Sequence, residues 1–250
     1  MIPAHKFPLG QRLVNNMIDR SFRKYFDGIY LRSAEDYTAE QQLPLIICAN
    51  HSSWWDGYVA SLVEWHFGLD AYLMMEEAQL KRYFFFTWVG CFSVDRQNVR
   101  SALQSLQYAG KILAGHPERF VWMFPQGEIE PNDRRPLTFF NGAAYVARQL
   151  HSASLVPAAI RIEFLGEQRP ALFISLGKSQ KVGKEETQTP HFLKSQTHLL
   201  EQSVTAELDN LRADLIAGRY NDFTRIREGQ SSTNRIFDKL LFRKQIGRKV

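Results

Sequence analysis

Short apolar runs alternate along this chain with longer stretches in which apolar residues recur every three or four positions. Such runs are typical of buried strands, and the recurrence is typical of helices with one apolar face. The predicted strands cover residues 43–49, 71–75, 89–94, 119–124, 154–162 and 171–176. The predicted helices cover residues 13–29, 54–67, 99–113, 141–150 and 193–215, the third capped by Asn98. The alternation predicts a single α/β domain with a mixed, largely parallel sheet flanked by helices.

Basic residues gather at the two ends of the chain, among apolar residues at helical spacing. Residues 1–24 hold five Lys or Arg and one Asp, and residues 225–250 hold eight Lys or Arg, one Glu and one Asp. The two ends therefore carry net charges of +4 and +6. Because the whole chain has a net charge of only +5, the middle of the chain is acidic. We predict an amphipathic N-terminal helical segment at 1–35, an α/β domain at 36–220 and a basic amphipathic C-terminal tail at 221–250.

Amphipathic basic segments suit the surface of an anionic bilayer, where the apolar side is buried and the cations meet lipid phosphates. The alternatives are a helix that packs on the core and a tail that is simply solvated. A basic tail also suits nucleic acid, but no helix-turn-helix, zinc-ligand or aromatic RNA-binding pattern accompanies it. The longest apolar runs, residues 43–49 and 84–92, are shorter than the roughly 20 residues that cross a bilayer. We therefore expect peripheral contact with a membrane and no nucleic-acid partner.

Composition narrows the class of protein and its compartment. With 44% hydrophobic and 23% charged residues, the chain is neither disordered nor fibrous. Its two cysteines, Cys48 and Cys91, lie in apolar stretches, which excludes a disulfide framework and fits a reducing compartment. The first ten residues show no signal-peptide pattern. The expected location is cytoplasmic, on the inner face of the membrane.

A histidine and a carboxylate follow the first predicted strand. His51 lies at its carboxyl end, where open α/β sheets bind ligands, and Asp56 lies five residues later. Five residues of ideal helix place two side chains about 140° apart, so the pair meets only if His51 precedes the helix, with Ser52 or Ser53 as the cap. Asp56 would then fix the tautomer of His51 and leave the other ring nitrogen free to accept a proton. Alone, the spacing is a weak signal, and a buried histidine with a satisfied hydrogen bond is the alternative.

Three more short blocks follow in order, each beside a predicted strand. They are Gly90-Cys91-Phe92-Ser93-Val94-Asp95-Arg96, Phe124-Pro125-Gln126-Gly127-Glu128 and Val156-Pro157. Together with Asn50 to Asp56, these blocks resemble the ordered motifs NHxxxxD, GxxFxxR, FPxG and VP of the PlsC-like glycerolipid acyltransferases. The resemblance extends from about Asn50 to Ala159.

The resemblance implies O-acyl transfer from an acyl thioester, acyl-CoA or acyl-carrier protein, to a hydroxyl of a lipid. His51 would deprotonate the acceptor, Asp56 would support the imidazolium, and no acyl-enzyme is expected. Arg96 would hold the phosphate of the acceptor, although it could also be a surface arginine paired with Asp95. Gln126, Gly127 and Glu128 are the other expected acceptor-binding residues. No cofactor beyond the acyl donor is expected, and no metal, because the histidines are scattered.

The third block departs from the family pattern. Many members continue Phe-Pro with Glu-Gly-Thr/Ser-Arg, whereas this chain has Gln126-Gly127-Glu128-Ile129. Glu128 would repel an anionic phosphate, although Arg134 and Arg135 could restore positive charge. The expected acceptor is lysophosphatidic acid or another lysophospholipid. The alternatives are a non-phosphorylated glycolipid or other hydroxylated lipid, hydrolysis with water as acceptor, and a non-catalytic lipid-binding membrane protein of the same fold.

Overall fold

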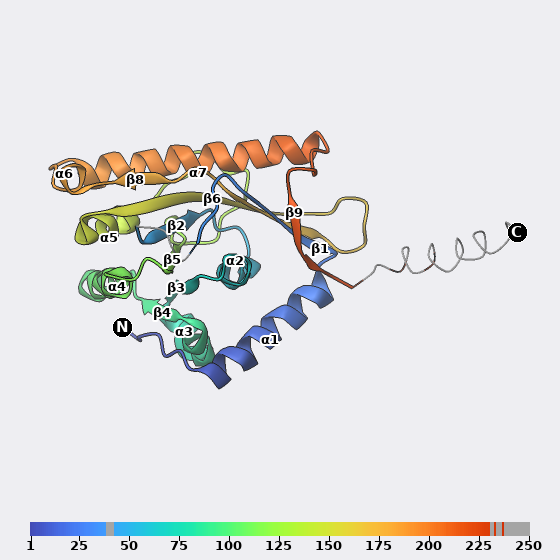
Figure 1. Cartoon of the computed structure of the whole chain (residues 1–250), viewed down its shortest axis with the longest axis horizontal. Helices are drawn as coiled ribbons and strands as arrows, with labels where there is room; N and C mark the ends of the chain where they lie inside the picture. Colours follow the sequence, from blue (N-terminus) through green and yellow to red (C-terminus); the bar gives the residue numbers. More distant parts are fainter. Residues whose placement is uncertain (39–42, 231–232, 234–236, 238–250) are drawn as a thin grey trace, which may run out of the picture.

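The structure, a computed structural model, describes residues 1–38, 43–230, 233 and 237 (Figure 1). Its strands are β1 Gly28–Ser33, β2 Leu45–Ala49, β3 Asp70–Glu76, β4 Cys91–Val94, β5 Arg119–Met123, β6 Ala153–Glu163, β7 Ala171–Leu176, β8 Gln180–Val182 and β9 Thr224–Glu228. Its α-helices are α1 Pro8–Tyr25, α2 Val59–Phe67, α3 Glu77–Arg82, α4 Val99–Leu113, α5 Gly142–Leu150, α6 Lys184–Thr187 and α7 Phe192–Ile216. Two 3-10 helices, η1 Trp54–Tyr58 and η2 Phe84–Val89, complete the described elements.

The strands form one mixed sheet in the order β4-β3-β5-β2-β6-β7-β1-β9, with β8 paired to β6. Neighbours from β4 to β6 are all parallel, whereas β6–β7, β6–β8 and β1–β9 are antiparallel. The prediction of a mixed, largely parallel sheet flanked by helices is confirmed. Because β4, β3, β5 and β2 run the same way, their carboxyl ends meet at one edge of the sheet. Open α/β sheets bind their ligands at this edge.

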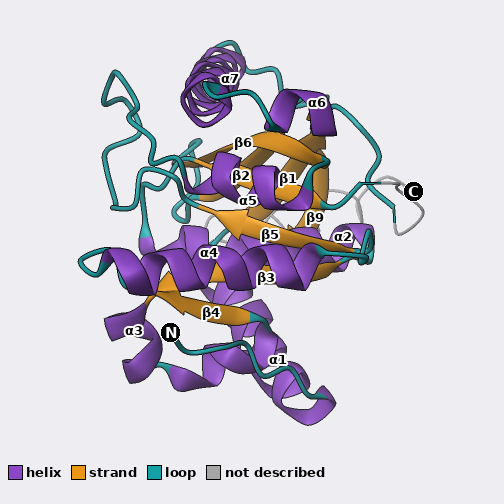
Figure 2. Ribbon diagram, turned by 90° about the vertical axis from the view of Figure 1, so that its left-hand side faces the viewer, coloured by secondary structure: helices purple, strands orange, loops and turns teal. Residues whose placement is uncertain are grey.

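Strand β2 lies in the core and serves both faces of the sheet. Leu45, Ile47 and Ala49 contact one apolar cluster, which includes residues of α1 and α2. Ile46 and Cys48 contact a second cluster, built from α4, α5 and α7. Since all five side chains are buried, β2 reads as a continuous apolar run rather than an alternating one. Figure 2 shows α7 and α1 on opposite sides of the sheet.

The Val-Pro block lies in β6 at a point where the strand changes partners. Residues up to Leu155 pair with β8, and residues from Ala158 onward pair with β7. Pro157 falls between the two ladders on that side, so its missing N–H leaves no gap in the hydrogen bonding. The carbonyl of Pro157 accepts a bond of 2.8 Å from the Gly177 N–H. A proline is therefore tolerated in the middle of this sheet.

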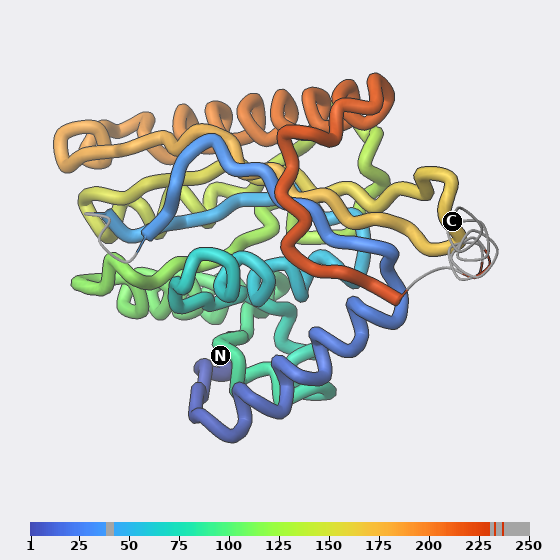
Figure 3. Tube along the Cα trace, turned by 45° about the vertical axis from the view of Figure 1, so that its right-hand side comes forward, coloured from blue at the N-terminus to red at the C-terminus, as the bar shows by residue number. Residues whose placement is uncertain are grey.

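Both predicted terminal segments contribute strands to the sheet. The helix expected over residues 13–29 ends at Tyr25, and β1 follows from Gly28. Strand β9, in the stretch expected to be a basic tail, pairs antiparallel with β1, as Figure 3 shows at the blue and red ends of the tube. The boundaries predicted at 35/36 and 220/221 are thus not edges of the sheet. The rest of the tail, residues 231–250 apart from 233 and 237, lies outside the described residues.

Candidate active site

His51 and Asp56 meet at the carboxyl end of β2. Nδ1 of His51 lies 3.0 Å from Oδ2 of Asp56, and the carboxylate is fully buried. The pair forms because His51 precedes η1, which carries Asp56, as the spacing required. A carboxylate only accepts hydrogen bonds, so Nδ1 carries the proton and Nε2 is left with a free lone pair. Among the described residues, Nε2 has no hydrogen-bond partner.

The two serines after His51 hold the carboxylate. The backbone N–H groups of Ser52 and Ser53 donate to Oδ2 of Asp56 over 2.6 and 2.8 Å. The Ser53 hydroxyl donates to Oδ1 over 2.7 Å. A buried carboxylate needs such donors because it has lost its water. Ser53 is the N-cap of η1, as one of the two serines was expected to be.

Two polar side chains, Asn50 directly after β2 and Gln126 in the loop after β5, fix the backbone around His51. Asn50 accepts from the Ile160 N–H in β6 over 2.8 Å and donates to the Ile160 carbonyl over 3.0 Å. Oε1 of Gln126 accepts from the His51 N–H over 2.9 Å, and its amide nitrogen donates to Glu130 over 2.6 Å. The Glu130 N–H in turn donates to the His51 carbonyl over 2.8 Å. The loop after β5 thus holds the backbone of His51 in place through hydrogen bonds.

The same segment places an aromatic ring and a glycine beside the imidazole. The rings of Phe124 and His51 are stacked, with centroids 4.1 Å apart. Gly127 has φ +78°, a conformation that favours glycine. A Cβ at this position would lie 2.8 Å from Nη1 of Arg96 and 2.9 Å from the Phe140 ring. Gly127 is therefore required both by its backbone and by the close approach of Arg96.

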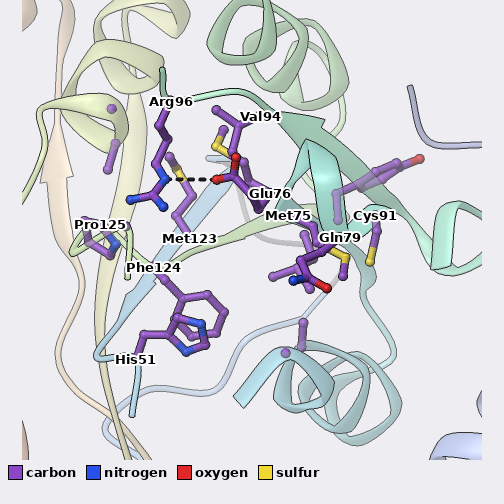
Figure 4. Close-up of a pocket in the computed structure, with 18 of the residues that line it drawn as sticks. His51, Met75, Glu76, Gln79, Cys91, Val94, Arg96, Met123, Phe124 and Pro125 are labelled. Atoms are coloured by element: carbon purple, nitrogen blue, oxygen red, sulfur yellow. Dashed lines mark hydrogen bonds and ion pairs between the residues drawn. The ribbon is translucent and has the colours of Figure 1, made fainter. Parts of the chain in front are cut away.

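His51 opens onto a cavity of about 560 Å³ (Figure 4). Its walls come from the carboxyl ends of β3, β4 and β5 and from α2, η2, α4 and α5. The apolar part of the lining includes Leu73, Met75, Phe86, Val89, Cys91, Leu106, Met123 and Ile129. Of the apolar residues of η2, Phe86 and Val89 line the cavity, and Phe84 is exposed.

Arg96 follows β4 and lines the cavity, but its partner was not singled out from the sequence. Its Nε donates to Oε2 of Glu76 over 3.0 Å. Glu76 ends β3 and lies in register with Val94 of β4, so the two strand ends bring the charges together. Asp95, the alternative partner, instead accepts from the Gln97 N–H. The signal that could have found Glu76 is its position at a strand exit on the same edge of the sheet.

The remaining predicted residues lie apart from the cavity lining. Gln126 is buried behind His51, and Glu128 is exposed. Arg134 pairs with Glu130 over 2.7 Å, and Arg135 pairs with Asp209. The structure thus brings His51, Asp56, Arg96 and Gly127 together, and leaves Glu128 and both later arginines outside.

Burial keeps one thiol and two phenol groups of the cavity neutral. It raises the pKa of the Cys91 thiol to about 12, and it raises the pKa of Tyr58 to about 12 with a smaller contribution from Cys91. Tyr72 also has a pKa raised to about 12, chiefly by burial and then by the charge of Asp70. A thiol that stays protonated at neutral pH is a poor nucleophile. Cys91, Tyr58 and Tyr72 are therefore unsuited to act as bases in the cavity.

Ser93 marks another departure from the family motif. It stands where GxxFxxR has phenylalanine, and its side chain is fully buried. Its hydroxyl accepts from the Ile2 N–H over 2.6 Å and lies 3.2 Å from Glu77. The polar side chain thus anchors the N-terminal residues to β4.

Two searches of the described residues bear on ligands and membranes. No group of three or more His, Cys, Asp or Glu side chains there is arranged to hold a metal ion. No helix in the described ranges is both long and apolar enough to span a bilayer.

Comparison with known proteins agrees with the motifs. The sequence model of the family described as Acyltransferase matches residues 31–161, which is more than half of the chain. A search of curated proteins gave no significant match. Among solved structures, the 1-acyl-sn-glycerophosphate acyltransferase PlsC from Thermotoga maritima matches with a TM-score of 0.52 and 15% identity, over 82% of this chain and 79% of that one. At this identity the likeness is one of fold.

The family match covers His51, Asp56, Arg96 and Gly127, the residues that the structure gathers at the strand ends. The resemblance drawn from the four motifs is confirmed by the family model and by the fold. This chain belongs to the acyltransferase family.

Proposed function

We propose that the protein transfers a fatty acyl group from an acyl thioester to a hydroxyl of a lysolipid, with His51 as the general base. The observation that carries the proposal is the arrangement of the imidazole. Nδ1 is held by the buried Asp56, while the ring lines an apolar cavity of about 560 Å³. A cavity of this size and character suits an acyl chain.

The chemistry follows from this geometry. The acceptor hydroxyl gives its proton to Nε2 of His51 as its oxygen attacks the thioester carbonyl. Asp56 stabilises the imidazolium that forms. The tetrahedral intermediate collapses, the carbon–sulfur bond breaks, and the departing thiolate takes the proton from Nε2. The products are an acylated lipid and a free thiol, and His51 is neutral again.

The substrates follow from the same reaction. The donor is acyl-CoA or acyl-carrier protein, whose thioester is already activated, so no cofactor or metal is needed. The acceptor is a monoacyl lipid, and its headgroup contacts Arg96 and Gly127. The acceptor printed for the Thermotoga maritima PlsC, 1-acyl-sn-glycerophosphate, belongs to this class.

The experiment is release of free thiol from acyl-CoA and acyl-carrier protein, with lipid products identified by mass. The acceptors are lysophosphatidic acid, a second lysophospholipid and a lysoglycolipid. We expect one thiol released for each acyl group gained by an acceptor. Release that is independent of acceptor would mean hydrolysis. Absence of release with every pair, while the protein still binds lipid, would identify a non-catalytic lipid-binding protein.

We further propose that α1 docks the protein on a membrane surface, as the 1–35 segment was predicted to do. Val14, Ile18 and Phe22 face the core. Leu9 and Leu13 are more than half exposed, with Arg12 and Arg20 exposed among them. The helix packs on η2, where the Phe84 side chain is 60% exposed. Exposed apolar side chains flanked by cations suit the headgroup layer.

A paired substitution of the two leucines tests this docking surface. The variant Leu9→Glu, Leu13→Glu is expected to lower partitioning onto anionic vesicles about tenfold or more, because two leucines no longer enter the bilayer. The measurement is co-sedimentation with vesicles. The matched control is Leu199→Glu, an exposed leucine of α7 on the other side of the sheet. Equal loss in both variants would contradict docking through α1.

The basic tail is expected to contribute separately, through charge. Since β9 is part of the sheet and the Gln230 N–H donates to the Arg23 carbonyl, the truncation must begin after Gln230. It removes six Lys or Arg and one Asp. We expect weaker vesicle binding at low salt and a smaller difference at high salt, because salt screens the attraction. A difference that does not change with salt would exclude an electrostatic role.

A further inference from the structure

Glu76 and Arg96 are the charged side chains among the described residues that line the cavity. They form an ion pair of 3.0 Å, so the site as a whole carries no excess positive charge. We propose that the acceptor lipid carries an uncharged, hydroxyl-rich headgroup of the sugar or polyol class, bound against this pair, and that Glu76 selects against a phosphate there. The inference rests on the proposed function and specifies its acceptor.

The Glu76–Arg96 pair leaves both a hydrogen-bond acceptor and hydrogen-bond donors free, and a polyol hydroxyl can use both kinds of group. Glu76 engages Arg96 through Oε2, and the guanidinium engages it through Nε, so Oε1 and the Nη groups remain for a ligand. A hydroxyl can donate to the carboxylate and accept from the guanidinium at once. A phosphate dianion has no proton to donate, and it would meet the Glu76 carboxylate beside Arg96, the one Lys or Arg among the described lining residues.

Neutral polar groups line other parts of the cavity. They are Gln79, Asn141 and Tyr145, and Figure 4 shows Gln79 beside Met75. Amide and phenol groups donate and accept as sugar hydroxyls do. Ile129 presents an apolar side chain to the cavity. None of these four side chains adds positive charge.

Three other basic side chains that could have bound a phosphate form ion pairs outside the cavity lining. Lys81 pairs with Glu77 over 2.7 Å, and Arg134 pairs with Glu130 over the same distance. Arg135 pairs with Asp209. Gly127 also confines Arg96, since its Cα faces Nη1 so closely that no Cβ would fit. The guanidinium is therefore held beside Glu76.

The test compares two acceptors that share one acyl chain and one free glycerol hydroxyl. One is lysophosphatidic acid, and the other carries an uncharged galactose in place of the phosphate. For the wild type, we expect kcat/KM to be at least about tenfold higher for the galactolipid. In Glu76→Gln, the freed Arg96 should raise the relative kcat/KM for lysophosphatidic acid by about tenfold or more. Glu185→Gln, which removes the same charge at an exposed position of α6 outside the lining, should keep the wild-type ratio.

The outcomes separate this inference from the proposed function. Transfer that favours lysophosphatidic acid in the wild type, or an acceptor ratio unchanged in Glu76→Gln, overturns the headgroup assignment and leaves acyl transfer intact. Loss of transfer with every acceptor overturns the proposed function. In that case, equilibrium binding of galactosylglycerol and glycerol 3-phosphate still decides the headgroup assignment, because wild type must bind the former more tightly.

Discussion

We expect His51→Ala to lower kcat for acyl transfer by about a thousandfold, within the range that general base catalysis contributes. Without the imidazole, the acceptor hydroxyl loses the base placed to take its proton, because Cys91, Tyr58 and Tyr72 stay neutral and Glu76 is paired with Arg96. The loss should fall on kcat rather than KM, since His51 is a small part of the cavity wall. Thiol release with saturating acceptor measures it.

A second histidine in the chain provides the matched control. Nδ1 of His116 lies 2.9 Å from Oε1 of Glu118, so it forms the same kind of pair as His51. It lies before β5, at the opposite end of the strand from Phe124. His116→Ala should therefore retain wild-type activity. A His51→Ala protein that keeps more than a tenth of the wild-type kcat would contradict the general-base role.

Asp56→Asn should lower kcat about a hundredfold or more while leaving the fold intact. An amide oxygen in place of Oδ2 can still accept from Ser52, Ser53 and His51, and the amide nitrogen can donate to the Ser53 hydroxyl. What is lost is the negative charge opposite the imidazolium. Unfolding temperature and kcat, measured on the same preparation, separate the two effects.

The double variant shows whether the two residues act as one unit. If Asp56 acts only through His51, the double variant is no slower than His51→Ala alone. Independent contributions would instead multiply, and that result would assign Asp56 a separate role. A large fall in unfolding temperature in Asp56→Asn would show that the carboxylate is required for folding rather than for catalysis.

The elements that sequence patterns predicted are those with strong local signals. Strand β2 is an unbroken apolar run, and α4 begins after Asn98, whose side chain accepts from the Ser101 N–H over 3.1 Å. Strand β9 was not predicted because Thr-Arg-Ile-Arg-Glu has little apolar alternation and gains its pairing from β1, far away in the sequence. Charged residues of this kind are common on edge strands. Arg225 and Arg227 therefore belong to the fold rather than to a solvated tail.

The sequence predicted the site residues that lie in short local motifs. It did not predict the contacts that depend on which strands are neighbours in the sheet. His51 and Asp56 could be predicted as a pair because both lie in one short segment. The Glu76 partner of Arg96 depends on β3 and β4 being neighbours, which no local pattern states. Gln126 was assigned to the acceptor from its block, and its bond to the His51 backbone depends on β5 lying beside β2. The sequence did not show which strands are neighbours in the sheet, and both of these contacts depend on it.

Residues of the loop after β5 face two directions, toward the backbone of His51 and toward the cavity. Gln126 and the Glu130 N–H hold the backbone of His51, whereas Gly127 and Ile129 face the cavity. The residues that fix the base and the residues that meet the acceptor thus alternate along one short loop. Under the proposed function, we expect a substitution at position 129 to change which headgroup is accepted, because Ile129 lines the cavity and does not hold the backbone of His51. Acceptor preference and the position of the base can therefore change independently along this loop.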